Sequence, residues 1–198
     1  MLTPVAKSWP SEWGVEANSL AIQVLGGAGY TRDFPVEQYW RDNRLNMIHE
    51  GTHGIHGLDL LGRKVAGNGG LGLKLLTQRI EATVTRARGV PVLAAHAGAL
   101  EQAWTDIQAA TRSAWSDADA SAALANATLY LQAFGHVVVA WLWLDVARLA
   151  AAKDDDFHRG KLQAARYFFR YELPKVGAWL QPAAIRDATC SDMQDAWF

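Results

Sequence analysis

The chain has 198 residues, of which 50% are hydrophobic and 20% are charged, and its formal net charge at pH 7 is −1. This composition predicts a packed core, and the balanced charge argues against nucleic acid or an anionic membrane surface as a partner. The single cysteine, Cys190, excludes an internal disulfide framework and is typical of a cytoplasmic protein. Residues 1–10 lack the apolar core of a signal peptide, and the apolar run at residues 137–144 is too short to cross a bilayer.

Helical spacing dominates the first third of the chain. Apolar residues recur at helical intervals over residues 11–25, and we expect a helix there that the glycine-rich residues 26–29 terminate. Pro35 is a favourable first helical residue and predicts a short second helix that runs to Asn43. A third helix is expected from about Thr52 to Val65.

The segment GNGGLG, residues 67–72, is the clearest break in the chain, with four glycines in six residues. Glycine disfavours regular structure, so we expect a linker here and a domain boundary. Residues 1–66 and residues 73–198 are therefore expected to form two separate domains.

The second half of the chain is also helical in pattern. Residues 73–84 predict one helix, Pro91 begins a second, and an alanine-rich stretch predicts a long helix over about residues 117–152. A last helix is expected over about residues 158–173, ended by Pro174. Sustained two-residue alternation is absent, so we predict an all-α protein in which one helical bundle is followed by a second, antiparallel one.

The five letters HEGTH, which begin at His49, fit two different chemistries. In the H-E-x-x-H zinc-protease signature, His49 and His53 bind the metal and Glu50 is the base. That motif needs an unbroken helix, and Gly51 within the turn costs about 1 kcal/mol relative to alanine. The extended signature also fails, because residues 56 and 59 are not glycine and histidine. We therefore predict no metal site and keep a zinc hydrolase only as a remote alternative.

The sequence around HEGTH favours carbon chemistry instead. Residues 21–65 contain four motifs in order: Gln-x-x-Gly-Gly-x-Gly-Tyr from Gln23, Pro-Val-Glu from Pro35, Arg-Asp-x-Arg from Arg41 and Glu-Gly-Thr from Glu50. Together they resemble the C-terminal helical domain of acyl-CoA dehydrogenases. The helical remainder resembles the subfamily that includes methylmercaptopropionyl-CoA dehydrogenase, whose members carry an extra C-terminal helical domain.

The resemblance implies an FAD-dependent α,β-dehydrogenation of an acyl-CoA thioester. Glu50 then matches the base that removes the α-proton while the β-hydrogen leaves as hydride to the flavin, and Gly51 lets the substrate lie against the backbone. A thioester α-proton is weakly acidic, so the site must raise the pKa of the base by desolvation and stabilise the enolate. The apolar neighbours Met47 and Ile48 suit a desolvated carboxylate.

The same resemblance assigns cofactor contacts. Gln23, Gly26 and Gly27 match the segment that reaches the FAD of a neighbouring subunit, although two glycines alone would fit a helix C-terminus equally well. Thr52 and Gly54 match positions that contact FAD, and Gly54 replaces the glutamine that relatives often carry. The implied partners are an acyl-CoA, an electron-transfer acceptor protein and further copies of the chain.

The resemblance covers only the back part of a longer enzyme, since the family's N-terminal helical domain and middle β-domain have no counterpart in this sequence. A truncated gene, a cloned fragment and a separate subunit all fit this observation. We expect the chain alone to bind FAD weakly or not at all, to be inactive, and to expose apolar surface. The alternative function is a non-catalytic helical interaction or oligomerisation module derived from the family.

Overall fold

A computed structural model describes residues 1–197, which form helices joined by short turns, with no strand in this range. The elements in chain order are α1 (Thr3–Leu25), α2 (Gly27–Tyr30), α3 (Val36–Arg44), η1 (Leu45–Met47), α4 (His53–Asp59), η2 (Leu60–Lys64), α5 (Gly67–Arg88), η3 (Pro91–Leu93), α6 (Ala94–Ala114), α7 (Ala120–Leu124), α8 (Ala127–Ala150), α9 (Asp156–Tyr167), η4 (Phe168–Glu172), α10 (Lys175–Ala184) and η5 (Asp195–Trp197). The prediction of an all-α protein is confirmed.

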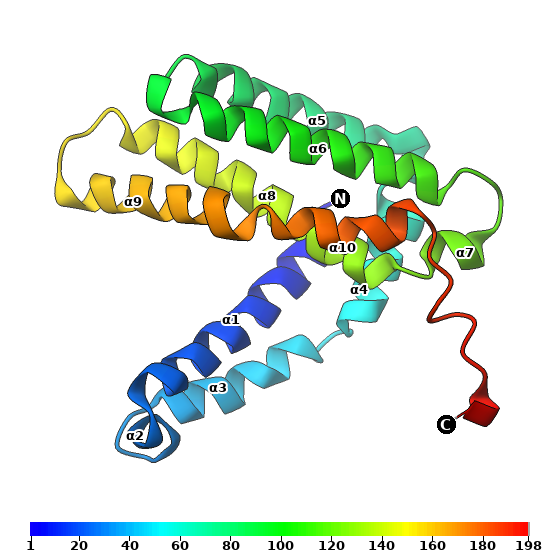
Figure 1. Cartoon of the computed structure of the whole chain (residues 1–198), viewed down its shortest axis with the longest axis horizontal. Coiled ribbons are helices and arrows are strands. Elements are labelled where there is room, and N and C mark those ends of the chain that lie inside the picture. The colour runs from blue at the N-terminus through cyan, green and yellow to red at the C-terminus, as the bar shows by residue number, and fades with distance from the viewer. Residues whose placement is uncertain (198) are drawn as a thin grey trace.

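Helices α1 and α3 pack side by side and project from the rest of the molecule, with α2 at the far tip (Figure 1). We call residues 3–44 the arm. The two helices approach closely where Gly14 meets Asn43, because a Cβ atom at Gly14 would lie 2.5 Å from the Asn43 Nδ2 atom. Only glycine fits such a contact without a shift of its neighbour.

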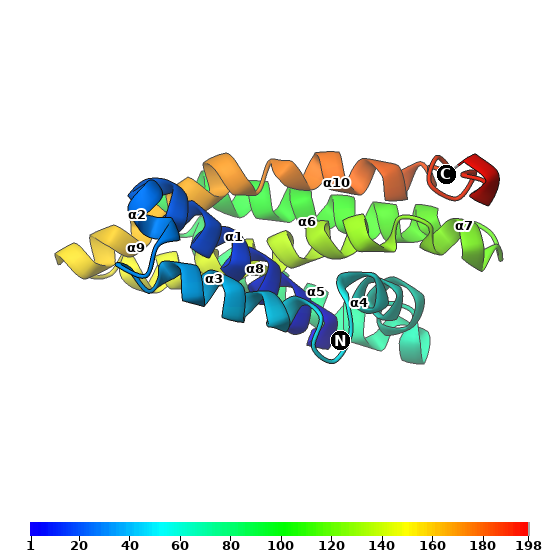
Figure 2. The same cartoon turned by 90° about the horizontal axis from the view of Figure 1, so that it is seen from below.

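The second half forms the predicted antiparallel bundle from α5, α6, α8 and the α9–α10 pair (Figures 1 and 2). Helix α8 is its centre, and the Tyr130 and Phe134 side chains on this helix are fully buried. Trp104 of α6 packs edge-on against Phe134, with the ring centroids 5.6 Å apart. Burial of each such aromatic side chain contributes roughly 1.5–3 kcal/mol, so α8 fixes the positions of its neighbours.

Helix α1 begins eight residues before the expected start at Ser11, since its first residue is Thr3. It carries Pro4 in its first turn, which is favourable, and Pro10 in its interior, which removes one backbone hydrogen bond. Val5 and Ser8 are buried where the arm meets the bundle and α4. Tertiary packing therefore outweighs the local cost of Pro10.

The single long helix expected over residues 117–152 is wrong, because the structure divides it into α7 and α8. Asp119 caps α7, and its carboxylate accepts a hydrogen bond from the Ser121 backbone N–H at 2.9 Å. Asn126 precedes α8, and its side-chain amide donates to the Asp187 carbonyl at 2.8 Å. A side-chain cap therefore begins α7, and a contact with the C-terminal segment holds the start of α8, where composition alone suggested one helix.

The helix expected to end at Pro174 is not the last one. Helix α9 continues through the π-helical turn η4, and α10 begins at Lys175 directly after Pro174. Proline is favourable at the start of a helix, so the residue interpreted as a terminator instead begins the next helix. Val176 and Leu180 of α10 are buried against the bundle.

The glycine-rich residues 67–72 form the beginning of α5 and contain a tight left-handed turn. Asn68, Gly69 and Gly70 have φ angles of 51°, 64° and 75°. Leu61 before this turn and Ile80 after it belong to one hydrophobic core. The division into two domains at this turn remains a prediction.

Helix α8 is long and apolar enough to cross a membrane by length and composition, with a mean hydropathy of 1.4 over its most apolar window. In this fold 61% of that window is buried inside the protein. The apolar residues of α8 therefore serve as the core of the bundle.

Candidate active site

The Glu-Gly-Thr segment lies at the base of the arm, between η1 and α4. Glu50 has a φ angle of 58°, which is uncommon for a residue with a side chain, and Gly51 follows with a φ angle of 114°. Backbone strain of this kind costs of order 1–3 kcal/mol and persists only where the surrounding structure maintains it. The segment is thus a sharp turn that presents the Glu50 carboxylate.

This turn separates the two histidines of HEGTH. His49 lies in the turn before Glu50, whereas His53 is the first residue of α4. The unbroken helix that a zinc protease needs is therefore absent. Among residues 1–197 there is no group of three or more His, Cys, Asp or Glu side chains close enough to hold a metal ion.

The Glu50 carboxylate is in solvent, with 68% of its side chain exposed, and it forms an ion pair with Lys7 of α1. The Lys7 Nζ atom lies 2.9 Å from Glu50 Oε2. The hydrogen bond from Lys7 and its charge hold the pKa of Glu50 below its usual value, and the charge of His49 acts in the same direction. The desolvated carboxylate with a raised pKa that we expected is absent from this chain, because Ile48 is itself 53% exposed.

Among the residues after Glu50, space remains beside Gly54 but not beside Gly51. A side chain at Gly51 would be strained by the backbone, and its Cβ atom would lie 3.2 Å from the His56 ring. Thr52 precedes α4, and its carbonyl accepts from the His56 backbone N–H at 3.1 Å while its side chain makes no capping hydrogen bond. A Cβ atom on Gly54 would meet only the Thr52 hydroxyl, at 4.0 Å.

The other expected cofactor residues lie far from this turn, at the tip of the arm. Gln23, Gly26 and Gly27 are exposed, and a Cβ atom on either glycine would meet nothing within 4 Å. Gly26 is 19 residues after Lys7, a span of about 28 Å at the rise of an α-helix. The structure therefore brings Glu50, Gly51, Thr52 and Gly54 together and separates them from Gln23, Gly26 and Gly27.

A cavity of about 380 Å³ opens at the tip of the arm beside these glycines. It is lined by residues of α1, α2, α3 and the loop between α2 and α3: Ile22, Tyr30, Thr31, Arg32, Glu37, Trp40 and Arg41. Arg41 pairs with Glu37 at 3.3 Å. Sequence reasoning missed Arg32 and Trp40, whose only signal is their nearness to the glycine motif.

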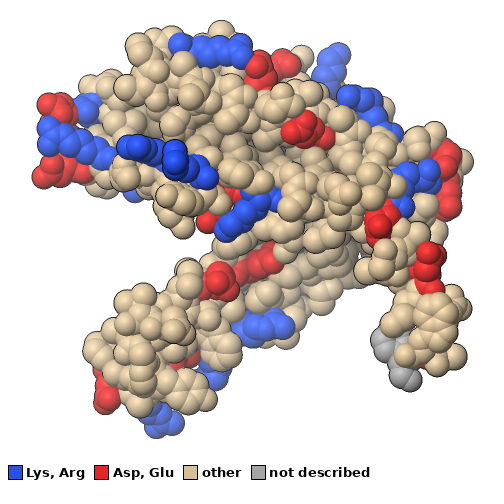
Figure 3. Space-filling view, in the orientation of Figure 1, with Lys and Arg blue, Asp and Glu red and all other residues tan. Residues whose placement is uncertain are grey.

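Large apolar side chains cover the arm and the turn below it. Exposed examples are Leu20, Val24, Tyr30, Phe34, Tyr39, Trp40, Leu45, Ile48, Ile55 and Leu58. The arm face in Figure 3 accordingly shows mostly uncharged surface. An apolar area of this kind typically marks a surface that another domain or subunit covers.

The base of the arm is anchored by a buried histidine that sequence reasoning did not single out. Trp9 of α1 donates its indole N–H to His136 Nδ1 of α8 at 3.0 Å. The rings of Trp13, Trp179 and Phe168 surround this imidazole. Burial lowers the pKa of His136 to about 4, so the ring is neutral at pH 7 and acts as a structural bridge.

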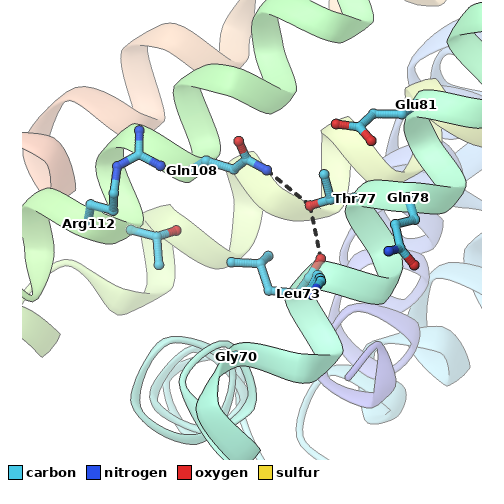
Figure 4. Close-up of a pocket in the computed structure, with 9 residues that line it drawn as sticks. Gly70, Leu73, Thr77, Gln78, Glu81, Gln108 and Arg112 are labelled. Carbon is cyan, nitrogen blue, oxygen red and sulfur yellow. Dashed lines mark hydrogen bonds between the residues drawn. The ribbon is translucent and has the colours of Figure 1, made fainter.

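A second cavity, of about 460 Å³, lies between α5 and α6 (Figure 4). The Thr77 hydroxyl accepts hydrogen bonds there from Gln108 at 3.0 Å and from Trp104 at 3.1 Å. Its lining residues include none from the arm or the Glu-Gly-Thr turn. This cavity is therefore separate from the candidate active site.

Two family models match the chain. Residues 1–66 match the acyl-CoA dehydrogenase C-terminal domain, and residues 76–194 match the family described as acetyl-CoA dehydrogenase C-terminal like. The second match alone covers more than half of the chain. Residues 67–75 lie between the two matches and contain the left-handed turn at the beginning of α5.

Curated relatives give the same result. The broad-specificity linear acyl-CoA dehydrogenase FadE5 of Mycobacterium tuberculosis is 26% identical over 100% of this chain and 35% of its own length. The 3-methylmercaptopropionyl-CoA dehydrogenase of Ruegeria pomeroyi is 32% identical over 89% of this chain and 32% of its own. A butyryl-CoA dehydrogenase of Syntrophomonas wolfei is 26% identical over 98% of this chain and 34% of its own. The chain spans about a third of the length of these relatives, and it belongs to the acyl-CoA dehydrogenase family of oxidoreductases, whose C-terminal domains it matches.

Proposed function

We propose that the chain is the C-terminal part of an FAD-dependent acyl-CoA dehydrogenase in which Glu50 is the catalytic base. The observation that carries this proposal is the strained Glu50-Gly51 turn, which presents a carboxylate at the base of the arm within a chain of this family. Strained residues are concentrated at active sites, where the strain fixes the geometry of a reacting group.

The chemistry follows from the turn. The Glu50 carboxylate takes the α-proton of the acyl-CoA, and the backbone N–H of Glu50 donates a hydrogen bond to the thioester carbonyl as negative charge develops there. Gly51 has no side chain, so the substrate approaches the backbone closely. Bound FAD supplies the acceptor for the β-hydrogen, which leaves as hydride.

Because Glu50 is exposed to solvent in this chain, the proposal requires that another part of the enzyme covers it. A carboxylate with a lowered pKa is a weak base, and a water-filled surface does not favour removal of a carbon-bound proton. The apolar side chains around the turn, Ile48, Ile55 and Leu58, offer a surface for a covering domain. We infer that the rest of the enzyme covers this surface and removes water from Glu50.

The cofactor residues fit FAD in a particular arrangement. Thr52 has a free side chain, and Gly26, Gly27 and Gly54 leave space that packing within the chain does not use. Gln23, Gly26 and Gly27 lie 16 to 20 residues beyond Lys7, a span of about 24–30 Å at the rise of an α-helix. One chain is therefore proposed to contact one cofactor at the base of the arm and a second at its tip. This arrangement supports a homo-oligomer in which the arm tip reaches a neighbouring subunit.

The proposed partners are an acyl-CoA substrate and an electron-transfer acceptor protein, in the cytoplasm. The relatives are named for different acyl groups, namely broad-specificity linear, methylmercaptopropionyl and butyryl groups. We therefore propose the thioester class as substrate and no particular acyl chain. The isolated chain is proposed to bind FAD weakly or not at all and to be inactive.

The test is to complement the chain with the part of FadE5 that it does not match, by fusion or co-expression. Purified material should then be yellow and reduce an electron-accepting dye when acyl-CoA is added. Glu50→Gln should abolish dye reduction while the flavin stays bound, and Glu16→Gln, an exposed glutamate of the same helical arm, should have no effect. A Glu50→Gln variant with normal turnover would exclude Glu50 as the base.

The alternative is a non-catalytic interaction module. The observations that favour it are the lowered pKa of Glu50 and the exposed apolar arm. It predicts an assembly without turnover in which Glu50→Gln changes nothing. The complementation experiment therefore separates the two functions.

A further inference from the structure

The two oxygens of the Glu50 carboxylate have different surroundings. Oε2 accepts the hydrogen bond from Lys7 Nζ at 2.9 Å. Oε1 faces the His49 ring, whose Nε2 atom lies 4.0 Å away and beyond hydrogen-bond distance. One oxygen is therefore held by a cation, and no hydrogen bond from residues 1–197 reaches the other.

Lys7 is the better fixed partner of this pair. Its side chain is 34% exposed, against 68% for Glu50. Its neighbour Ser8 is buried, and its own carbonyl accepts a hydrogen bond from the Ser11 hydroxyl at 2.8 Å. The ammonium group therefore extends from a rigid turn of α1 toward a carboxylate that is 43 residues distant in sequence.

The backbone conformation of Glu50 suggests why its carboxylate contacts Lys7. A φ angle of 58° turns the residue out of the path of the chain, and Gly51 with a φ angle of 114° allows the reversal. Surface ion pairs usually stabilise a fold only weakly, so stability alone is a poor reason for a strained glutamate to meet Lys7. The contact is better explained by the fixed orientation that it gives to the Glu50 carboxylate.

We propose that Lys7 is a positioning residue for Glu50: it holds Oε2 and leaves Oε1 as the oxygen that takes the α-proton. This inference rests on the proposed function. The α C–H bond breaks, its proton forms an O–H bond with Oε1, and the electron pair remains on the substrate as the enolate until the β-hydrogen leaves as hydride to the flavin. The groups that face the carboxylate are Lys7 and His49, and both favour its ionised form before the reaction.

The first test uses the chain itself, with glutamate carboxyl carbons labelled for NMR titration. Lys7→Met should raise the pKa of Glu50, because the hydrogen bond and the charge are lost, whereas Lys7→Arg should keep it low. Lys74→Met, which removes an exposed lysine of α5, is the matched control and should leave Glu50 unchanged. An unaltered Glu50 titration in Lys7→Met, with a normal helical spectrum, would show that the pair does not form in solution.

The second test uses the complemented enzyme. Lys7→Met should lower kcat by roughly ten- to a hundredfold with little change in KM, since the base is misplaced, and Lys7→Arg should restore most of the rate. The acid limb of the pH profile should also move to higher pH in Lys7→Met. If Lys7→Met and Lys7→Arg leave kcat unchanged in an active enzyme, Lys7 has no positioning role although the proposed function stands. If the wild-type complemented enzyme has no turnover, the proposed function fails, and the role assigned to Lys7 fails with it.

Discussion

The bridge between Trp9 and His136 predicts how the protein responds to acid. An indole N–H only donates a hydrogen bond, so His136 Nδ1 must accept at the observed 3.0 Å distance. The proton of the neutral ring is therefore on Nε2, which faces Glu172 Oε2 at 3.6 Å. Protonation of Nδ1 would place two donors against each other inside a cage of aromatic rings.

The magnitude follows from the pKa. Burial lowers the pKa of His136 from 6.5 to about 4, although Glu172 acts in the opposite direction. The unfolded chain binds more protons than the folded one between these two values, so stability falls as the pH decreases from about 6.5 to 4. A shift of 2.5 pH units at 1.36 kcal/mol each corresponds to about 3 kcal/mol. Below pH 4 this contribution should be constant.

Imidazole nitrogen NMR measures both the tautomer and the pKa of this residue. The expected spectrum shows a neutral ring with its proton on Nε2, and a titration midpoint near 4 that falls further in Glu172→Gln, because a carboxylate that attracts the charged ring is lost. Urea unfolding at pH 7 and at pH 4.5 should show the corresponding loss of stability. A proton on Nδ1, or a midpoint at or above 6.5, would refute the reasoning.

Three substitutions test the packing and capping described for the fold, each by urea unfolding. Gly57→Ala should destabilise the protein by about 1–3 kcal/mol, because the new Cβ atom would lie 2.7 Å from the Ala127 carbonyl oxygen; an unchanged midpoint would contradict the close contact of α4 and α8. Asp119→Ala removes the cap of α7 and should cost about 0.5–2 kcal/mol, and a smaller loss would mean that solvent replaces the cap. Asp117→Asn breaks the ion pair with Arg186, in which the carboxylate is 54% exposed, and should leave the urea midpoint almost unchanged; a clear loss of stability would mean that the pair is more than a surface contact.

The helical architecture was accessible from sequence because apolar spacing records which face of a helix is buried. The apolar spacing over residues 73–84 predicts a helix, and Ile80 and Val84 of that spacing are buried on one face of α5. Helix boundaries were harder to predict from sequence, because the effect of a proline or an asparagine on a helix depends on the residues packed around it. Pro10 is tolerated inside α1 by tertiary packing, and Pro174 begins a helix that it was expected to end.

The site was accessible only in part. The expected helices leave Glu50 and Gly51 in the connection between Asn43 and Thr52, and the structure adds the left-handed backbone that makes this connection a sharp turn. Lys7 was not predictable, because the residues before Ser11 gave no sign of a helix and the contact joins residues 43 positions apart. The exposure of the carboxylate was also missed, since apolar neighbours in sequence do not cover a side chain unless the fold packs them over it.

The central claim is that Glu50 removes the α-proton of an acyl-CoA. Exchange of deuterium from heavy water into the α-carbon of the acyl-CoA measures this step directly in the complemented enzyme, and mass spectrometry detects the label. Wild-type protein should incorporate deuterium, and Glu50→Gln should incorporate none above the uncatalysed background while it still binds the substrate. Deuterium incorporation by Glu50→Gln at the wild-type rate would contradict the account.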